Sequence, residues 1–173
     1  MIKKYSIIIF FMLSFSNHIY SAETVSDDKK DGLWNTGKIN KLYLKGKNSN
    51  YKRGHDALKQ AKKYAKKGNE DKAKKRFNDA AKFFTLANKK FPNDPNILNY
   101  LGYTLKMVGD FTMAEIYYEQ GLEIDPLNIG INKYLGKLYV ETSRIDKAND
   151  RLKVLENCEC EEFKELQNLI SKY

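Results

Sequence analysis

Two cysteines separated by one residue are the side chains in this sequence best suited to covalent chemistry. Cys158 and Cys160, in the segment NCEC, are the only cysteines of the 173 residues. Such a pair can close a small disulfide of an easily reduced kind, or remain as two small buried thiols. A structural role is favoured over thiol-redox work, because no thioredoxin-like strand pattern surrounds the pair. A zinc site is not expected, because zinc needs four ligands and no histidine lies nearby.

Other combinations of reactive side chains are missing from the sequence. His55 is the only histidine beyond the N-terminal segment, and no serine or cysteine partner is indicated for it. Asp110, Glu115, Glu119 and Glu123 recur at helical spacing, which is more typical of a solvated face than of an acid–base pair. No glycine-rich phosphate loop occurs. We therefore expect a protein that is not an enzyme and that uses no metal and no cofactor.

The first 22 residues have the order of parts of a secretory signal peptide. Lys3 and Lys4 precede an apolar run over residues 5–15, and a stretch of small residues ends at Ala22. This run is too short to span a bilayer as a helix, which takes about 20 residues. We expect cleavage near Ala22, export to a bacterial periplasm and an oxidising environment for the cysteines. An uncleaved membrane anchor is the alternative.

Charge is distributed unevenly along the chain. Residues 23–94 contain 20 Lys and Arg against 9 Asp and Glu, whereas residues 95–173 contain 9 against 13. An exported chain rarely meets nucleic acid, so we expect no nucleic-acid partner. The basic half suits an acidic protein or peptide or, through residues 29–67, an anionic membrane surface. Solvation of exposed helix faces explains the lysines more simply, because they are spread over helical positions.

Helical spacing of apolar residues dominates the sequence from Arg53 onward. Residues 23–52 show no sustained period and are expected to form a mobile arm, with a short helix near residues 36–44. A first helix is expected to end at Gly68, and a second to run over residues 70–90, where two prolines stop it. Five further helices are predicted at residues 96–107, 112–123, 129–141, 146–156 and 160–171. The predicted fold is all-α, built from helix pairs with short loops.

The sequence repeats itself with a period of 34 residues. A shift of 34 places the segment YLG at residues 100–102 on the YLG at residues 134–136. A helix–turn–helix repeat of this length resembles the tetratricopeptide repeat. The positions that carry the resemblance are Leu98, Leu101, Gly102, Leu105, Ala114, Tyr118, Gly121 and Pro126. Gly102 and Ala114 are small where the two helices of one repeat cross, and Gly121 is small where the second helix meets the next repeat.

The resemblance covers residues 53–173. The first unit, residues 53–94, departs from the pattern, because Ala73 and Ala114 lie 41 residues apart, which is one period plus seven. Seven residues are close to two helical turns, so we expect an elongated second helix that keeps its facing. Residues 95–128 and 129–162 are the two closer repeats, and residues 160–173 are expected to cap the last apolar face.

The resemblance implies a right-handed solenoid whose first helices line a concave, peptide-binding groove. The family's register gives the groove-facing residues Lys62, Lys66, Asn99, Tyr103, Lys106, Lys133, Lys137 and Glu141. The five lysines favour an acidic peptide or a chain carboxylate, and solvation of the groove explains them equally well. The Asn/Lys/Arg clamp of chaperone-binding members is not reproduced, because Tyr100, Gly130 and Tyr134 occupy its positions.

Two functions from different classes are consistent with these patterns. The first is a non-enzymatic adaptor or scaffold of the cell envelope, which binds a peptide or protein in a basic concave groove. The alternative is a thiol-redox or apoprotein-handling factor that uses Cys158 and Cys160. The sequence indicates neither the identity of the partner nor the oligomeric state.

Overall fold

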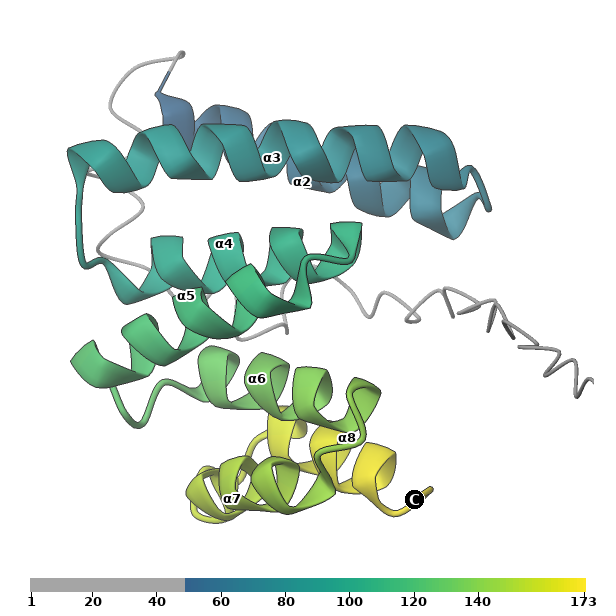
Figure 1. Ribbon diagram of the computed structural model, residues 1–173, viewed down its shortest axis with the longest axis vertical. Coiled ribbons are helices and arrows are strands. Elements are labelled where there is room, and N and C mark those ends of the chain that lie inside the picture. Colours follow the sequence, from purple (N-terminus) through teal and green to yellow (C-terminus); the bar gives the residue numbers. More distant parts are fainter. Residues whose placement is uncertain (1–48) are drawn as a thin grey trace, which may run out of the picture.

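The described part of the chain consists of helices joined by turns. The computed structural model describes residues 49–173, so the expected signal peptide and the expected helix near residues 36–44 lie outside the described residues. Seven helices follow one another and stack in antiparallel pairs (Figure 1). They are α2 (Asn50–Lys66), α3 (Glu70–Lys90), α4 (Pro95–Val108), α5 (Phe111–Ile124), α6 (Ile129–Glu141), α7 (Ile145–Leu155) and α8 (Glu161–Ile170). No strand occurs within residues 49–173, so the all-α prediction is confirmed.

Local capping residues set the helix boundaries, and those from residue 70 onward lie within one residue of the predicted ones. At the start of α4, the Asp94 carboxylate accepts hydrogen bonds from the N–H groups of Asn96 (2.9 Å) and Ile97 (3.2 Å). Pro95 occupies the first helical turn, where its missing N–H costs nothing. The helix ends at Gly109, whose φ of 92° lies in the left-handed region that favours glycine. The boundaries are therefore encoded locally.

Each pair of helices packs on the next to form a stack closed by α8. Helix α2 packs on α3, α4 on α5 and α6 on α7, and contacts between α3 and α4 and between α5 and α6 join successive pairs. Helix α8 contacts both α6 and α7 at the end of the stack (Figure 1). Leu166 of α8 is fully buried there. Helix α8 thus covers the apolar face that the last pair would otherwise expose.

Glycines at two helix crossings allow the close approach that the sequence predicted. A Cβ atom on Gly102 would lie 2.5 Å from Cε1 of Tyr118, within the α4–α5 pair. A Cβ on Gly121 would lie 2.5 Å from Cδ1 of Ile131, where α5 meets α6. Both distances are far below a normal carbon–carbon contact of about 3.5–4.0 Å. The small residues therefore admit large partners, and the predicted role of these positions is confirmed.

The first pair is extended in both of its helices, whereas the sequence analysis expected only the second to be long. Gly54 faces Phe84, because a Cβ on Gly54 would lie 2.7 Å from Cε1 of that ring, so this contact corresponds to Gly102 and Tyr118. From Gly54 to the turn at Gly68 there are 14 residues, and from there to Phe84 there are 16. The corresponding separations in the second pair are seven and nine. Each helix has gained seven residues, about two turns.

Helix α2 begins three residues earlier than the sequence analysis expected. The side chain of Ser49 caps it by accepting a hydrogen bond from the N–H of Lys52 at 3.2 Å. Tyr51, in the first turn, is only 2% exposed. The arm expected to end at residue 52 is therefore wrong in its last residues, which belong to α2 and contribute to the core. The apolar pattern did not indicate this start, because the buried residues of the first turns are Tyr51 and Gly54, and glycine gives no apolar signal.

An aromatic cluster joins the first pair to the second and encloses the imidazole of His55. The ring of His55 packs edge-on against Tyr51 (4.5 Å between centroids), Tyr100 (4.4 Å) and Phe84 (5.5 Å). Phe84 and Tyr100 are stacked at 4.8 Å. Burial lowers the pKa of His55 to about 4, since the apolar surroundings disfavour the charged imidazolium. The negative charge of Asp56 opposes this effect and the positive charge of Lys62 adds to it.

The low pKa of His55 predicts a loss of stability on acidification. In the unfolded chain the imidazole protonates near pH 6.5, whereas in the folded protein it stays neutral until about pH 4. Stability is therefore complete above pH 6.5 and declines as the pH falls toward 4, by up to about 3 kcal/mol. Urea unfolding between pH 7 and 4.5 checks this. The variant His55→Phe should decline less over that window, and an equal decline in both proteins would contradict the prediction.

Candidate functional site

The first helices of the three pairs, α2, α4 and α6, carry the eight residues that the sequence assigned to a groove. Most are covered rather than open to solvent. Asn99, Tyr103, Lys106 and Lys133 are between 2% and 5% exposed. Lys62 is also buried and Lys137 half-buried, whereas Lys66 and Glu141 are exposed. Lysines buried to this degree are rare unless their charge is balanced.

Two tyrosines and three lysines form a continuous row across these helices, which we call the tyrosine–lysine ladder. Nζ of Lys62 lies 5.5 Å from the ring centroid of Tyr103. That ring meets Tyr134 edge-on at 5.1 Å. Nζ of Lys133 and Nζ of Lys137 then lie 4.7 Å and 6.0 Å from the Tyr134 centroid. Each ammonium group is at a distance where the ring quadrupole attracts a cation. The ladder therefore brings together four of the eight predicted residues and adds Tyr134.

Carboxylates of the same chain balance the lysines at the α6 end. Nζ of Lys106 lies 2.5 Å from Oε1 of Glu141, which joins α4 to α6. Nζ of Lys133 lies 3.9 Å from Oε1 of Glu162 and 3.6 Å from Oε2 of Glu165. Nζ of Lys137 lies 3.1 Å from the same Oε2 of Glu165. The positive charge of this face is therefore largely compensated by α8 and by Glu141, and Lys66 remains exposed near the end of α2.

Asn99 adds a polar group to the same face of α4. It lies four residues before Tyr103, so the two side chains are neighbours on one helix face. The residue is 3% exposed, and its Oδ1 accepts no hydrogen bond within the described residues. A buried amide oxygen without a donor is costly, by about 1–3 kcal/mol. An N–H group of a bound peptide would relieve this cost.

The sequence analysis missed three residues of this site. Tyr134 was considered only as part of the repeat and as a residue at a clamp position, and Glu162 and Glu165 were not assigned to the groove. A signal was present, because Lys133 and Lys137 are four residues apart and Glu162 and Glu165 are three apart. Each pair therefore lies on one face of its helix. The spacing does not predict that α8 packs on α6, and this packing brings the two faces together.

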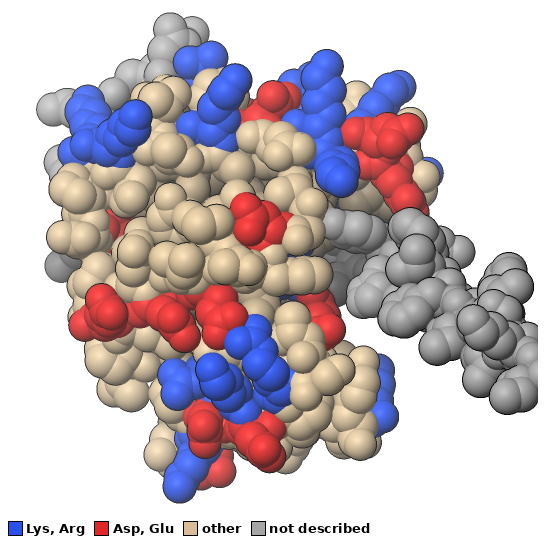
Figure 2. Space-filling model, in the orientation of Figure 1, with Lys and Arg blue, Asp and Glu red and all other residues tan. Residues whose placement is uncertain are grey.

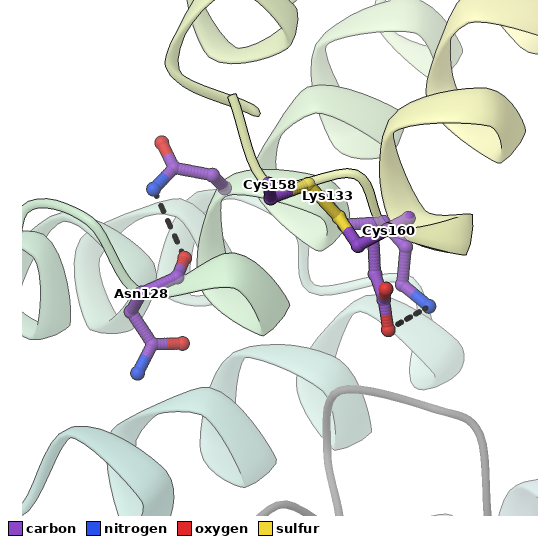
Figure 3. Close-up of a disulfide and its surroundings, with 6 residues drawn as sticks. Asn128, Lys133, Cys158 and Cys160 are labelled. Carbon is purple, nitrogen blue, oxygen red and sulfur yellow. Dashed lines mark hydrogen bonds and ion pairs between the residues drawn. A yellow bond between two sulfur atoms is a disulfide. The ribbon is translucent and has the colours of Figure 1, made fainter. Parts of the chain in front are cut away.

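The two cysteines are joined in the loop between α7 and α8. Figure 3 shows the Cys158–Cys160 disulfide, with Lys133 drawn among its surroundings. The two Cα atoms are 5.1 Å apart. Cys160 is the residue immediately before α8 and caps it with backbone only. The sequence left open a structural disulfide, a redox-active disulfide or two separate buried thiols. The structure contains a disulfide, so the two cysteines are not separate thiols. A redox role remains a prediction.

Removal of this disulfide is expected to have a small effect on stability. Because the bond closes a loop of only three residues, its constraint on the unfolded chain amounts to about 1–2 kcal/mol. The double variant Cys158→Ser/Cys160→Ser should therefore fold, with hydrogen exchange accelerated first in α8. Native-state exchange followed by mass spectrometry measures this. A loss of all helical structure, or faster exchange in α2 and α3 before α8, would contradict it.

The acidic face of α5 is partly used inside the molecule. Oε1 of Glu115 accepts a hydrogen bond from Nη1 of Arg144 at 2.7 Å, and Lys147 lies 3.9 Å away. The hydrogen bond from Arg144 lowers the pKa of the Glu115 carboxyl, although burial acts against it. The hydroxyl of Tyr139 donates to Glu119 at 3.3 Å. Glu115 and Glu119 thus tie the second pair to the third.

Two other kinds of feature are absent from the described residues. Within residues 49–173 no three His, Cys, Asp or Glu side chains are grouped so that they could hold a metal ion. None of the helices α2 to α8 combines the length and the apolar character needed to cross a bilayer. The tyrosine–lysine ladder with its balancing carboxylates is therefore the strongest candidate site in this part of the chain.

The fold and this face together define a stack of antiparallel helix pairs, closed by a cap helix, with an aromatic and charged row along its first helices. No protein-family model matches the chain, and no curated protein matches it. Among solved structures it is similar to the type III secretion translocator chaperone SycD of Yersinia enterocolitica. The TM-score is 0.49 with 19% sequence identity, and the match covers 68% of this chain and 78% of that chain.

Proposed function

We propose that this chain is a non-enzymatic adaptor of the tetratricopeptide-like type, which binds an acidic peptide segment of a protein partner along the tyrosine–lysine ladder. The observation that carries the proposal is the run of rings and ammonium groups from Lys62 through Tyr103 and Tyr134 to Lys133. The rings of Tyr103 and Tyr134 are 5% and 4% exposed, so their part in this site is to position the ammonium groups. The lysines supply a charge preference.

The internal carboxylates suggest how an acidic ligand would bind. In these ion pairs the carboxylates are more exposed than the lysines. The side chain of Glu141 is 38% exposed and that of Glu165 is 30% exposed. Side-chain carboxylates of a partner offer the same chemistry and can take these places with little rearrangement of Lys106 and Lys137. A peptide N–H would also meet the buried Oδ1 of Asn99. Recognition would therefore exchange one set of carboxylates for another.

Site-specific photo-crosslinking in cells tests this proposal. A photoreactive amino acid would replace Lys66 or Glu141, which are exposed beside the ladder, or replace Gln120 of α5 or Lys153 of α7, which are exposed elsewhere. The expected result is one shared partner captured from the first two positions and not from the controls. Its crosslinked peptide, mapped by mass spectrometry, should be rich in Asp and Glu. Equal capture from all four positions, or a basic or uncharged peptide, would overturn the proposal.

The Cys158–Cys160 disulfide supports a second candidate function. A thiol-redox or apoprotein-handling factor would need Cys158 and Cys160 to cycle between thiol and disulfide. The double serine variant separates the two functions. An adaptor retains its crosslinks from Lys66 and Glu141 in that variant, whereas a redox factor loses its activity in cells while the ladder is unchanged.

We further propose that the protein acts in the cell envelope after export. The N-terminal pattern of Lys3, Lys4 and the apolar run up to residue 15 supports this location. Mass spectrometry of the protein from fractionated cells provides the test. The expected species begins at Glu23 and is recovered from the periplasm. An intact chain recovered from the cytoplasm would exclude export.

A further inference from the structure

Charge in the described part of the chain is separated between the two ends of the stack. Residues 49–93, which hold α2 and α3, contain 14 Lys and Arg against 4 Asp and Glu. Residues 94–173 contain 9 against 14. Figure 2 shows basic side chains projecting along the edge that α3 forms, and acidic side chains in a band over α5. The basic charge therefore lies at one end and faces outward.

Five lysines of α3 form a row on the face turned away from the rest of the molecule, which we call the outer lysine row. Its members are Lys72, Lys75, Lys82, Lys89 and Lys90. The opposite face of α3 is buried through Ala73, Phe77, Ala80, Phe84 and Ala87. Lys75, Lys82 and Lys89 recur every seven residues, so they stay within about 20° of one line and about 10 Å apart. The row is straight because the helix that carries it is continuous.

The outer lysine row is not neutralised by ion pairs within residues 49–173, although Asp71 and Asp79 lie on the same helix and Asp79 pairs with Arg76. All five lysines are exposed, and within residues 49–173 none of them forms an ion pair. Lys72 and Lys90 lie 5.8 Å and 5.5 Å from the rings of Tyr64 and Phe91, and the other three extend into solvent. By contrast, Lys133 and Lys137 of the ladder are matched by Glu162 and Glu165. The two basic surfaces are therefore built for different purposes.

The composition of the row distinguishes between classes of partner. Protein–protein interfaces are enriched in aromatic residues and arginine and depleted in lysine. Arg76, the only arginine of α3, is paired with Asp79, so the unpaired cations of this helix are lysines, and its only exposed large apolar residue is Leu86. A straight line of flexible point charges matches a flat polyanionic surface, where each lysine raises the partition coefficient about fivefold, equivalent to about 1 kcal/mol. The row suits lipid head groups better than it suits a shaped protein surface.

We propose that the outer lysine row of α3 binds the surface of an anionic phospholipid membrane. The attachment is electrostatic and reversible, because no apolar side chain of the row reaches into the bilayer. Helix α3 makes its main contacts with α2 and α4 on its inner side, so a membrane along its outer side does not meet the tyrosine–lysine ladder. The surface differs from residues 29–67, the region that the sequence had suggested for membranes, and it is independent of the proposed peptide site.

Vesicle co-sedimentation of the whole chain tests the proposal. The variant Lys75→Gln/Lys82→Gln/Lys89→Gln removes three charges from the row. The control variant Lys153→Gln/Lys164→Gln/Lys172→Gln removes three exposed charges from the other end of the stack, so both variants have the same net charge and the same N-terminal segment. Vesicles of equal parts phosphatidylglycerol and phosphatidylethanolamine are compared with vesicles of phosphatidylcholine. Circular dichroism establishes that both variants are folded.

The row variant should bind anionic vesicles roughly 100-fold more weakly than the unmodified protein, because three lysines each contribute about fivefold. The control variant should change binding by less than about threefold, since its lysines face away from the membrane. Raising the salt from 50 to 300 mM should release the unmodified protein. Equal losses in the two variants, or equal binding to phosphatidylcholine, would overturn the proposal. So would a row variant that still binds vesicles but no longer self-associates or no longer captures an acidic protein.

Discussion

Replacing Gly102 by leucine is expected to lower the free energy of unfolding by at least about 3 kcal/mol, because the new side chain would occupy the position of a buried ring. Even a Cβ at this residue would lie 2.5, 2.6 and 2.7 Å from three atoms of the Tyr118 ring. Tyr118 is fully buried between α4 and α5 and has no free space to enter. The gain in helix propensity from removing glycine, about 1 kcal/mol, is too small to offset this clash.

The variant Tyr118→Ala, alone and combined with Gly102→Leu, makes the test specific to this contact. Tyr118→Ala alone should cost about 3–5 kcal/mol through the cavity that it leaves. In the double variant the leucine fills part of that cavity, so the combined loss should be smaller than the total of the two single losses by at least about 1 kcal/mol. Urea unfolding measures all three. Gln120→Leu, on the exposed face of α5, is the control. Additive losses would show that the two residues do not share one space.

The second large effect is expected at Lys133, which anchors α8. Lys133→Met should cost about 3–5 kcal/mol, because it leaves buried carboxylates without their cation. The side chain of Lys133 is 2% exposed and that of Glu162 is 8% exposed, so water cannot replace the missing charge. The loss should be accompanied by rapid hydrogen exchange in α8, since Lys133 and Lys137 are the residues that hold its acidic face to α6.

A second variant separates the charge effect from loss of packing. Lys133→Met/Glu162→Met removes both charges and keeps their volume, so it should recover most of the stability lost in the single variant. The control Lys164→Met changes an exposed lysine of α8. Its free energy of unfolding should stay within about 0.5 kcal/mol of that of the unmodified protein. If the double variant were as unstable as Lys133→Met, the ion cluster would not be the reason that α8 is held in place.

The architecture could be predicted from the sequence because the information for it is local. Asp94, Pro95 and Gly109 set the ends of α4 through neighbours only a few residues away. Gly102 and Gly121 fall at fixed intervals that repeat, so their close contacts followed from the period. The lengths of the two helices in the first pair were harder to predict. Its glycine contact joins Gly54 to Phe84, 30 residues apart, and no local rule indicates that two helices have lengthened together.

The charge balance of the site could not be predicted in the same way. The register of the repeat grouped Tyr103 with Lys62, Lys133 and Lys137, and these side chains lie in one row of ring and ammonium contacts. Spacing does not reveal which carboxylate lies opposite. Glu162 and Glu165 reach the lysines only because α8 packs across α6, with Leu166 against Gly136, where a Cβ would lie 2.5 Å from Cδ2 of that leucine. That arrangement depends on tertiary packing.

The two additional turns in each helix of the first pair have a practical consequence. In Figure 1 the α2–α3 turn extends past the ends of α4 and α5, so beyond that point, among residues 49–173, the two helices pack mainly on each other. Gly68 and Asn69 at its tip are exposed, and nothing lies within 4 Å of a Cβ built on Gly68. Fraying that begins there can stop before it reaches the aromatic cluster around Phe84. A fluorescent protein or an epitope spliced in between Gly68 and Asn69 should leave the rest of the fold intact.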